Sequence, residues 1–380
     1  MNNSVYITKL AKFLPGNPVG NDEMEEYLGY VGGKKSRSKS IVLRNNKITT
    51  RYYSRDKQGN STHTNAELTK EAINALCNSS GVKIDDIELL TCGTTSPDQI
   101  LPAHGVMVHG LLNTKPVEAI TFSGSCCSGM NALKYAFMSI QTGNSNNAIT
   151  TGSEKLSTWM SSQSFEEEAN KLKELESDPM LSFDKDFLRW MLSDGAAAAL
   201  LSNKANENEL SLKIEWIEIC SFANEVEACM YVGSDKDAEG NLHGWSEYKP
   251  KEWLDKSIFA MKQDTRLLDK HIAQLGTKKY VELFKKHNVD PQSIDWFLPH
   301  ISSEFFRSKV DDEMKKYGVE LPQEKWFVIL STVGNIGAAS IFLAMEELMN
   351  SGKLKKGQKI ALTVPESARF SYANALLTVV

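Results

Sequence analysis

The sequence has few cysteines, little net charge and no long apolar run, and each of these absences excludes a class of protein. Six cysteines among 380 residues include no Cys-x-x-Cys pair, so neither a disulfide framework nor a metal site is expected. A formal net charge of −5 provides no basic field for nucleic acid. No segment approaches the roughly 18 apolar residues that span a bilayer, and the first residues lack signal-peptide features. We expect a cytoplasmic protein with reduced thiols and no membrane partner.

Strand-like and helix-like segments alternate along the whole chain, which is typical of a layered α/β protein. Apolar runs at residues 87–92, 148–152 and 196–201 predict buried strands, and residues 326–330 predict another. Residues 156–190 interrupt this rhythm with a charged stretch. A solvated helix is one interpretation of that stretch, and a lid over a cleft is the other.

Two segments far apart in the sequence resemble each other. Residues 127–143 predict a helix that small residues open and a glycine closes, followed by an apolar strand. Residues 335–352 repeat this arrangement and lead into a second apolar strand. Two copies of a glycine-terminated helix followed by a strand indicate a duplicated fold.

Residues 123–130, Ser-Gly-Ser-Cys-Cys-Ser-Gly-Met, contain the first candidate for chemistry. They connect a short apolar run to the first of these helices, so the cysteines lie at the positive end of the helix dipole. That position favours a thiolate over a thiol and predicts a lowered cysteine pKa. Cys127 is the first candidate for a nucleophile and Cys126 the second. A buried structural thiol is the alternative.

A cysteine nucleophile needs a partner that accepts or donates a proton, and two residues are candidates. His300 directly follows a short buried strand, where active-site groups of α/β folds gather. Asn335 stands just before the second small-residue helix, where its amide can donate to developing negative charge. Each also has a simple structural interpretation, as a satisfied histidine and as a helix cap. A cysteine at the start of one helix, together with an asparagine at the start of the repeated helix, is a more specific pattern than either residue alone.

The chain resembles the ketoacyl synthase III type of the thiolase superfamily over nearly its whole length. Residues 125–130 look like the family's Ala-Cys-Ala-Gly-Phe motif, with Cys127 in the nucleophile position. Residues 295–300 look like its Asp-Trp-(apolar)-Pro-His motif, and residues 334–340 look like its Gly-Asn-(Thr)-Ser-Ala-Ala-Ser motif. Supporting matches lie at residues 93–98 and 193–196.

This resemblance implies a thiolase-like α/β fold with a duplicated αβαβα architecture. Its N-terminal half, residues 1–205, would carry the nucleophile, and its C-terminal half, residues 206–380, would carry the histidine and the asparagine. A helical insertion at about 156–190 would lie over the active site. The resemblance also implies a homodimer that needs no cofactor of its own. Its substrates would be acyl thioesters, carried on the phosphopantetheine of coenzyme A or an acyl carrier protein.

The implied activity is that of a β-ketoacyl synthase III-like acyltransferase. Cys127 would take an acyl group from a thioester, and a malonyl- or β-ketoacyl-type thioester would then enter. His300 and Asn335 would donate to the oxygen of that second thioester and stabilise its enolate, which attacks the acyl group in a Claisen-type condensation. The backbone N–H groups of Cys127 and Ala368 would hold the tetrahedral oxyanion.

The sequence departs from the family pattern in two places. Residues 366–370 read Glu-Ser-Ala-Arg-Phe, where the family has Gly-Gly-Gly-Phe before the last strand. A backbone N–H survives at Ala368, because only proline would remove it. Glu366 and Arg369 of this loop are candidates for substrate contact. Arg51 is a third candidate, because residues 48–51 echo the family's Ile-x-x-Arg element behind an unusual insertion near 32–39.

Related families differ in the residues they need. A thiolase needs a second, C-terminal cysteine, but none follows Cys229, and a hydroxymethylglutaryl synthase needs a glutamate where Thr95 stands. Plant-type polyketide synthases share the Cys–His–Asn set and are not separated by it. Residues 299–303 look similar to ketosynthases of dialkylresorcinol and flexirubin pathways, which form a cyclohexanedione. A Cys–His–Asn acyl hydrolase or acyltransferase using the same acyl-enzyme, and a non-catalytic scaffold, are the alternatives.

Overall fold

The computed structural model describes residues 3–36, 38–164 and 187–380. Residues 165–186, the middle of the insertion expected at about 156–190, therefore lie outside the described part. Within the described ranges, no helix is long and apolar enough to cross a membrane.

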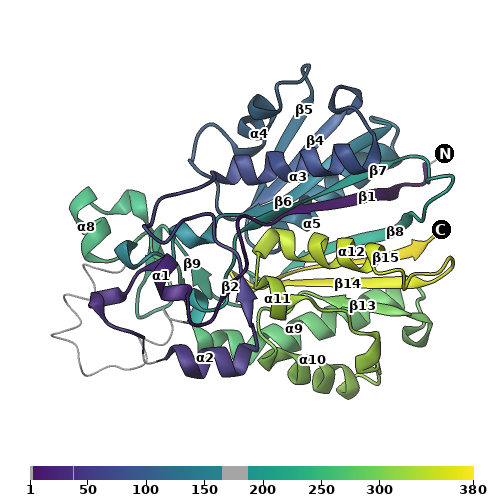
Figure 1. Cartoon of the computed structure of the whole chain (residues 1–380). Helices are drawn as coiled ribbons and strands as arrows, with labels where there is room; N and C mark the ends of the chain where they lie inside the picture. Colours follow the sequence, from purple (N-terminus) through teal and green to yellow (C-terminus); the bar gives the residue numbers. More distant parts are fainter. Residues whose placement is uncertain (1–2, 37, 165–186) are drawn as a thin grey trace.

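Nine strands of the described chain form one mixed sheet in the order β13-β14-β15-β8-β1-β7-β6-β4-β5 (Figure 1). Their bounds are β1 (Tyr6–Phe13), β4 (Leu89–Thr94), β5 (Glu118–Ser123), β6 (Asn147–Glu154), β7 (Gly195–Ser202), β8 (Leu212–Ser221), β13 (Trp296–Pro299), β14 (Lys359–Glu366) and β15 (Ser371–Val379). Short pairs outside it are β2 (Val19–Gly20) with β3 (Thr50–Arg51), β9 (Met230–Tyr231) with β12 (Lys262–Gln263), and β10 (Ser234–Lys236) with β11 (Leu242–Gly244).

The helices form layers around the sheet. Their bounds are α1 (Met24–Leu28), α2 (Lys39–Asn46), α3 (Asn65–Ser80), α4 (His104–Leu112), α5 (Cys127–Gln141), α8 (Pro250–Asp255), α9 (Thr265–Lys286), α10 (Phe305–Lys316), α11 (Leu330–Val333) and α12 (Ser340–Asn350). Figure 1 shows α3 and α4 on one side of the molecule and α9 and α10 on the other, with α5 and α12 between the two halves of the sheet. This is the expected αβαβα layering.

Strand pairing repeats between the two halves, which confirms the predicted duplication. In the first half β4 pairs in parallel with β5 and β6, and β6–β7 and β7–β1 are antiparallel. In the second half β13–β14 is parallel, and β14–β15 and β15–β8 are antiparallel. The halves join where β1 and β8 pair over two residues each. The boundary predicted between residues 205 and 206 falls in the connection between β7 and β8.

The strand expected at residues 326–330 is wrong. Trp326 makes only an isolated parallel bridge to Phe297 of β13, in the place that β5 takes beside β4 in the first half. The main-chain N–H of Phe327 donates once more to Phe297 at 2.9 Å. The chain then turns into α11 at Leu330, and this short helix leads it back toward the layer between the halves.

Helix α5 and strand β6 of the first repeat pack closely against the second repeat, because each has a glycine at the contact. A Cβ atom added to Gly129 of α5, or to Gly152 of β6, would lie 2.3 Å from the carbonyl oxygen of Ala338. Ala338 belongs to the one-turn helix Gly337–Ala339 that precedes α12. Only glycine permits this contact, so these positions bring the start of α5 beside the start of α12.

Candidate active site

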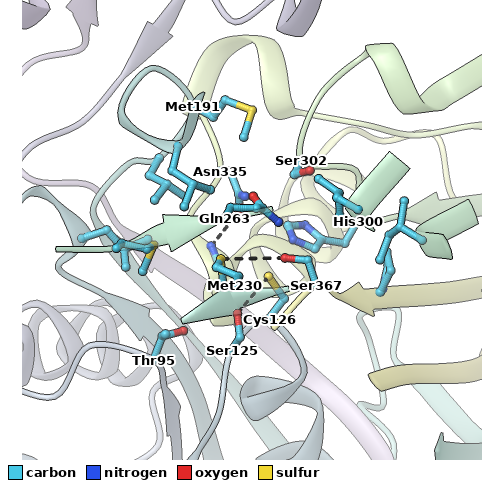
Figure 2. A pocket seen from close by; sticks show the side chains of 18 residues that line it. Thr95, Ser125, Cys126, Met191, Met230, Gln263, His300, Ser302, Asn335 and Ser367 are labelled. Carbon is cyan, nitrogen blue, oxygen red and sulfur yellow. Dashed lines mark hydrogen bonds between the residues drawn. The ribbon is translucent and has the colours of Figure 1, made fainter. Parts of the chain in front are cut away.

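A cavity lies where the two repeats meet, and both halves of the chain line it (Figure 2). The first half contributes Thr95, Ser125, Cys126, Leu156, Leu188, Met191 and Leu192, and the second half contributes Met230, Met261, Gln263, Leu268, Ile272, His300, Ser302, Asn335, Gly337, Pro365 and Ser367. Two of the three predicted catalytic residues, His300 and Asn335, therefore face one space. The lining is mostly apolar with a few convergent polar groups, as in other small-molecule sites.

Cys127 is the first residue of α5, and its side chain is turned toward the sheet. Its Sγ donates to the carbonyl oxygen of Val364 on β14 at 3.2 Å, and only 1% of the residue is exposed. Cys126, the second sequence candidate, is the cysteine that lines the cavity (Figure 2). The predicted nucleophile therefore lies next to a lining residue of the cavity, with its thiol hydrogen-bonded to the backbone of β14.

His300 directly follows β13 and is uncharged at neutral pH. Its main-chain N–H donates to Thr363 at 2.8 Å, which fixes the residue to the end of β14. The side chain is buried, and its Nε2 has no hydrogen-bond partner among the described residues. Burial lowers the pKa of His300 to about 4, because a charged imidazole is poorly solvated there. A neutral imidazole is able to donate to a substrate oxygen without carrying a charge into the site.

Asn335 is held by three hydrogen bonds that orient its amide. Its main-chain N–H donates to Met191 at 2.9 Å, and its carbonyl accepts from Ser193 at 2.9 Å. Its side-chain Oδ1 accepts from the N–H of Gly337 at 2.9 Å. Because Oδ1 is engaged, the Nδ2 group is the part of the amide that is able to donate to a ligand in the cavity.

Glu154, at the end of β6, ties the two repeats together beneath the cavity. It accepts from the hydroxyls of Thr95 and Ser96 at 2.6 Å each, and from the N–H of Ala338 at 3.1 Å. Burial raises its pKa to about 7. The sequence signal for Glu154 is only an acidic residue that ends a buried strand, which is too common a pattern to identify its role.

Glu366, the last residue of β14, reaches the start of α5. Its Oε2 accepts from the backbone N–H of Ser125 at 3.0 Å and of Cys127 at 3.1 Å. Burial raises the pKa of this carboxyl. A four-residue turn, 367–370, follows it, and Phe370 adopts a left-handed backbone with φ of 53°.

The cysteine pKa expected from the helix dipole is wrong in this structure. Burial raises the pKa of Cys127 well above its ordinary value, and the nearby negative charge of Glu366 adds a smaller effect in the same direction. Desolvation disfavours the thiolate, and a carboxylate on the same helix N–H groups takes up the favourable end of the dipole. The resting cysteine is therefore a neutral thiol.

The other predicted binding residues lie away from the cavity lining. Arg51 is fully buried, and its guanidinium donates to Asn21 and to the carbonyl of Trp190. Arg369 is exposed and donates to the carbonyl of Val226 at 3.4 Å. Their contact with substrate stays a prediction. Ala368 lies in the turn after Glu366, where its carbonyl accepts from Cys229 and Met230, and its oxyanion role also stays a prediction.

No group of three or more histidine, cysteine, aspartate or glutamate side chains within the described ranges could hold a metal ion. The polar groups of the cavity are a neutral imidazole, two primary amides, hydroxyls and a thiol. This set suits acyl transfer and stabilisation of an enolate.

Comparison with known proteins gives two family matches. Residues 284–378 match the C-terminal part of 3-oxoacyl-[acyl-carrier-protein] synthase III, and residues 50–183 match the thiolase N-terminal domain. These ranges cover parts of both repeats. The first includes His300, Asn335 and Glu366, and the second includes Cys127.

Individual relatives agree with these matches. The chain is 25% identical over 353 residues to β-ketoacyl-[acyl-carrier-protein] synthase III of Clostridium perfringens, covering 92% of each chain. The structure of an OleA variant of Xanthomonas campestris is similar with a TM-score of 0.76 and 18% identity, covering 99% of this chain and 98% of that one. The 3-oxoacyl-[acyl-carrier-protein] synthase III of Aquifex aeolicus gives a TM-score of 0.71 and 20% identity, covering 98% and 99%.

Proposed function

We propose that this chain, a β-ketoacyl synthase III-like acyltransferase of the thiolase superfamily, condenses an acyl group held on Cys127 with a malonyl- or β-ketoacyl-type thioester. The observation that supports the residue assignment is that His300 and Asn335, 35 positions apart by their numbers, line one cavity at the start of α5. A neutral imidazole and an oriented amide are both donors, so the pair matches the needs of an enolate rather than of a metal or a cation.

The first half-reaction is a thioester exchange. The Cys127 sulfur attacks the carbonyl carbon of the acyl thioester, its S–H proton passes to the carrier sulfur, and the carrier leaves as a free thiol. In the resting structure this thiol is bonded to Val364. Acylation therefore requires the Cys127 side chain to turn from β14 toward the cavity by a change of side-chain rotamer.

The second half-reaction forms the carbon–carbon bond. With a malonyl-type thioester, cleavage of the bond to the carboxylate releases CO2 and leaves its electron pair as an enolate, whose oxygen accepts from His300 and Asn335. The enolate carbon attacks the acyl carbonyl, and Cys127 leaves as a thiolate that takes a proton from water. Because His300 holds no charge above a pH of about 4, its donation does not depend on a protonation event near neutral pH.

We extend the proposal to the pathway, carrier and assembly. Two acyl-derived chains would be joined to form a cyclohexanedione, the precursor of dialkylresorcinols. This step is supported by the likeness of residues 299–303 to ketosynthases of dialkylresorcinol and flexirubin pathways, and by the altered loop at 366–370. The proposal also includes an acyl carrier protein as the preferred thioester carrier. It further includes assembly as a homodimer and a cytoplasmic location. The support for the carrier is that the curated relatives are synthases named for acyl-carrier-protein substrates.

Intact-mass spectrometry after incubation with a panel of acyl thioesters tests the nucleophile. We expect one acyl group on the wild-type protein and none on Cys127→Ala. Cys126→Ala is the matched control, because Cys126 lines the cavity and is its direct neighbour. Acyl mass that persists on Cys127→Ala and disappears from Cys126→Ala would move the assignment to Cys126.

The fate of the acyl group separates the proposed condensation from hydrolysis. Acylated enzyme is mixed with isotope-labelled malonyl thioester, and the products are identified by mass spectrometry. A β-ketoacyl product that carries both the acyl group and the label supports condensation. Release of the free acid alone would favour the Cys–His–Asn hydrolase, and failure to acylate with any thioester would favour the scaffold.

A further inference from the structure

Glu366 occupies a position that the proposed reaction needs to be empty. Its Oε2 accepts from the N–H groups of Ser125 and Cys127 at 3.0 and 3.1 Å. Under the proposed function, the N–H of Cys127 holds the oxyanion that forms when an acyl group is transferred. The carboxylate oxygen and the oxyanion carry the same charge and need the same donor, so they are not bound there together.

The Cys127 thiol, beside Glu366, is hydrogen-bonded to the same strand, β14. Cys127 donates its S–H to Val364, and only a protonated thiol makes that hydrogen bond. Val364 and Glu366 lie two positions apart on β14, so one strand end holds both the thiol and the helix donors. The two contacts describe a single resting arrangement in which neither the nucleophile nor its oxyanion donor is available.

Glu366 supplies the negative charge nearest to this arrangement. It adds to the effect of burial in raising the pKa of Cys127. The other titratable groups near the pair are Cys126 of the α5 cap, Glu154 of β6, Cys220 of β8, Cys229 before β9, His300 after β13 and Tyr372 of β15. None of these is a cation at neutral pH, because His300 is neutral, so nothing in this set offsets the carboxylate.

We propose that Glu366 gates the active site by filling the oxyanion position of the free enzyme and keeping Cys127 as a resting thiol until a substrate oxygen displaces it. This inference rests on the proposed function. The neighbours of Glu366, Pro365 and Ser367, line the cavity, so the displaced carboxylate has that cavity as its alternative position. Glu366 is thus a positioning residue that protects the thiol from reactive molecules that cannot occupy the oxyanion position.

Alkylation of Cys127 by iodoacetamide tests the gate without an acyl substrate. All proteins carry Cys126→Ala, so that a label in the peptide containing residue 127 has one source. Glu366→Gln keeps the size and the two accepted hydrogen bonds but removes the charge. Glu366→Ala removes the hydrogen bonds as well as the charge. Glu346→Gln is the control, because this buried glutamate of α12 pairs with Lys12 outside the cavity lining. Thermal melting checks that each variant is folded.

We expect alkylation at pH 7.5 to be about tenfold faster in both Glu366 variants, because loss of the carboxylate charge lowers the pKa of the Cys127 thiol. The Glu346→Gln control should react at the wild-type rate. Equal or slower alkylation in a folded Glu366→Gln or Glu366→Ala protein would overturn the gate. The two variants differ in packing, so one of them is able to report if the other does not fold.

The rate of acyl transfer to Cys127 gives a second readout. If Glu366 blocks the oxyanion position, Glu366→Ala accepts an acyl group at least as fast as the wild type. A lower acylation rate in both variants, with alkylation unchanged, would make Glu366 a base rather than a gate and would overturn the proposal. Faster alkylation together with no acylation by any thioester would leave the gate intact and refute the proposed function alone.

Discussion

His300 links the chemistry of the site to the stability of the protein. The structure holds its imidazole buried with a pKa of about 4, against an ordinary value of 6.5. Between these two pH values the unfolded chain binds a proton at this residue and the folded chain does not. Stability therefore rises with pH through this window and is lost as pH falls through it. A difference of about 2.5 pKa units at ~1.4 kcal/mol each gives about 3.5 kcal/mol for the full effect, of which about 3 kcal/mol is lost between pH 7 and pH 4.

Replacing His300 with glutamine removes this titration. Urea unfolding at a series of pH values from 7 to 4 should give a free energy of unfolding that falls with acid in the wild type, and by about 3 kcal/mol less in His300→Gln. His104→Gln is the matched control. His104 is also buried, with a pKa lowered to about 4, and it contacts Thr69 and Ser153 instead of lining the cavity.

Both variants should flatten the pH dependence of stability, but only His300→Gln should lose decarboxylation of a malonyl thioester. An unchanged acid slope in His300→Gln would refute the argument that the imidazole is buried and neutral. Normal decarboxylation in the same variant would refute its role as an enolate donor. The two measurements are independent, so either part of the reasoning is able to fail alone.

Three further variants test other contacts. Asn335→Asp should lower decarboxylation about 10²- to 10³-fold, because it replaces an oriented donor with a negative charge at the enolate oxygen; a steady-state assay showing wild-type turnover would contradict this. Gly129→Ala should lower the melting temperature and reduce the free energy of unfolding by about 1–3 kcal/mol, because the added Cβ overlaps Ala338. Gly110→Ala, in open space on α4, is the control and should be neutral or stabilising. Thr64→Ala should cost about 1 kcal/mol in urea unfolding by breaking the capping box of α3; an unchanged midpoint would argue against that cap.

Local sequence patterns determined the layered α/β fold and the candidate residues. The runs at 87–92, 148–152 and 196–201 became β4, β6 and β7, because buried strands leave continuous apolar segments. The repeated helix starts located Cys127 and Asn335, and a strand end located His300. These are short-range signals, since a strand that ends at a turn or a helix that opens on small residues is set by a few neighbouring positions.

Only the tertiary structure decided what surrounds these residues. The contacts of Glu366 with the N–H groups at the start of α5 join positions about 240 residues apart in the chain. The direction of the Cys127 thiol, the reversal of its expected pKa and the loss of a strand at 326–330 depend on how two repeats pack against each other. Desolvation and charge act over distances of a few ångströms in space, and no spacing along the sequence encodes them.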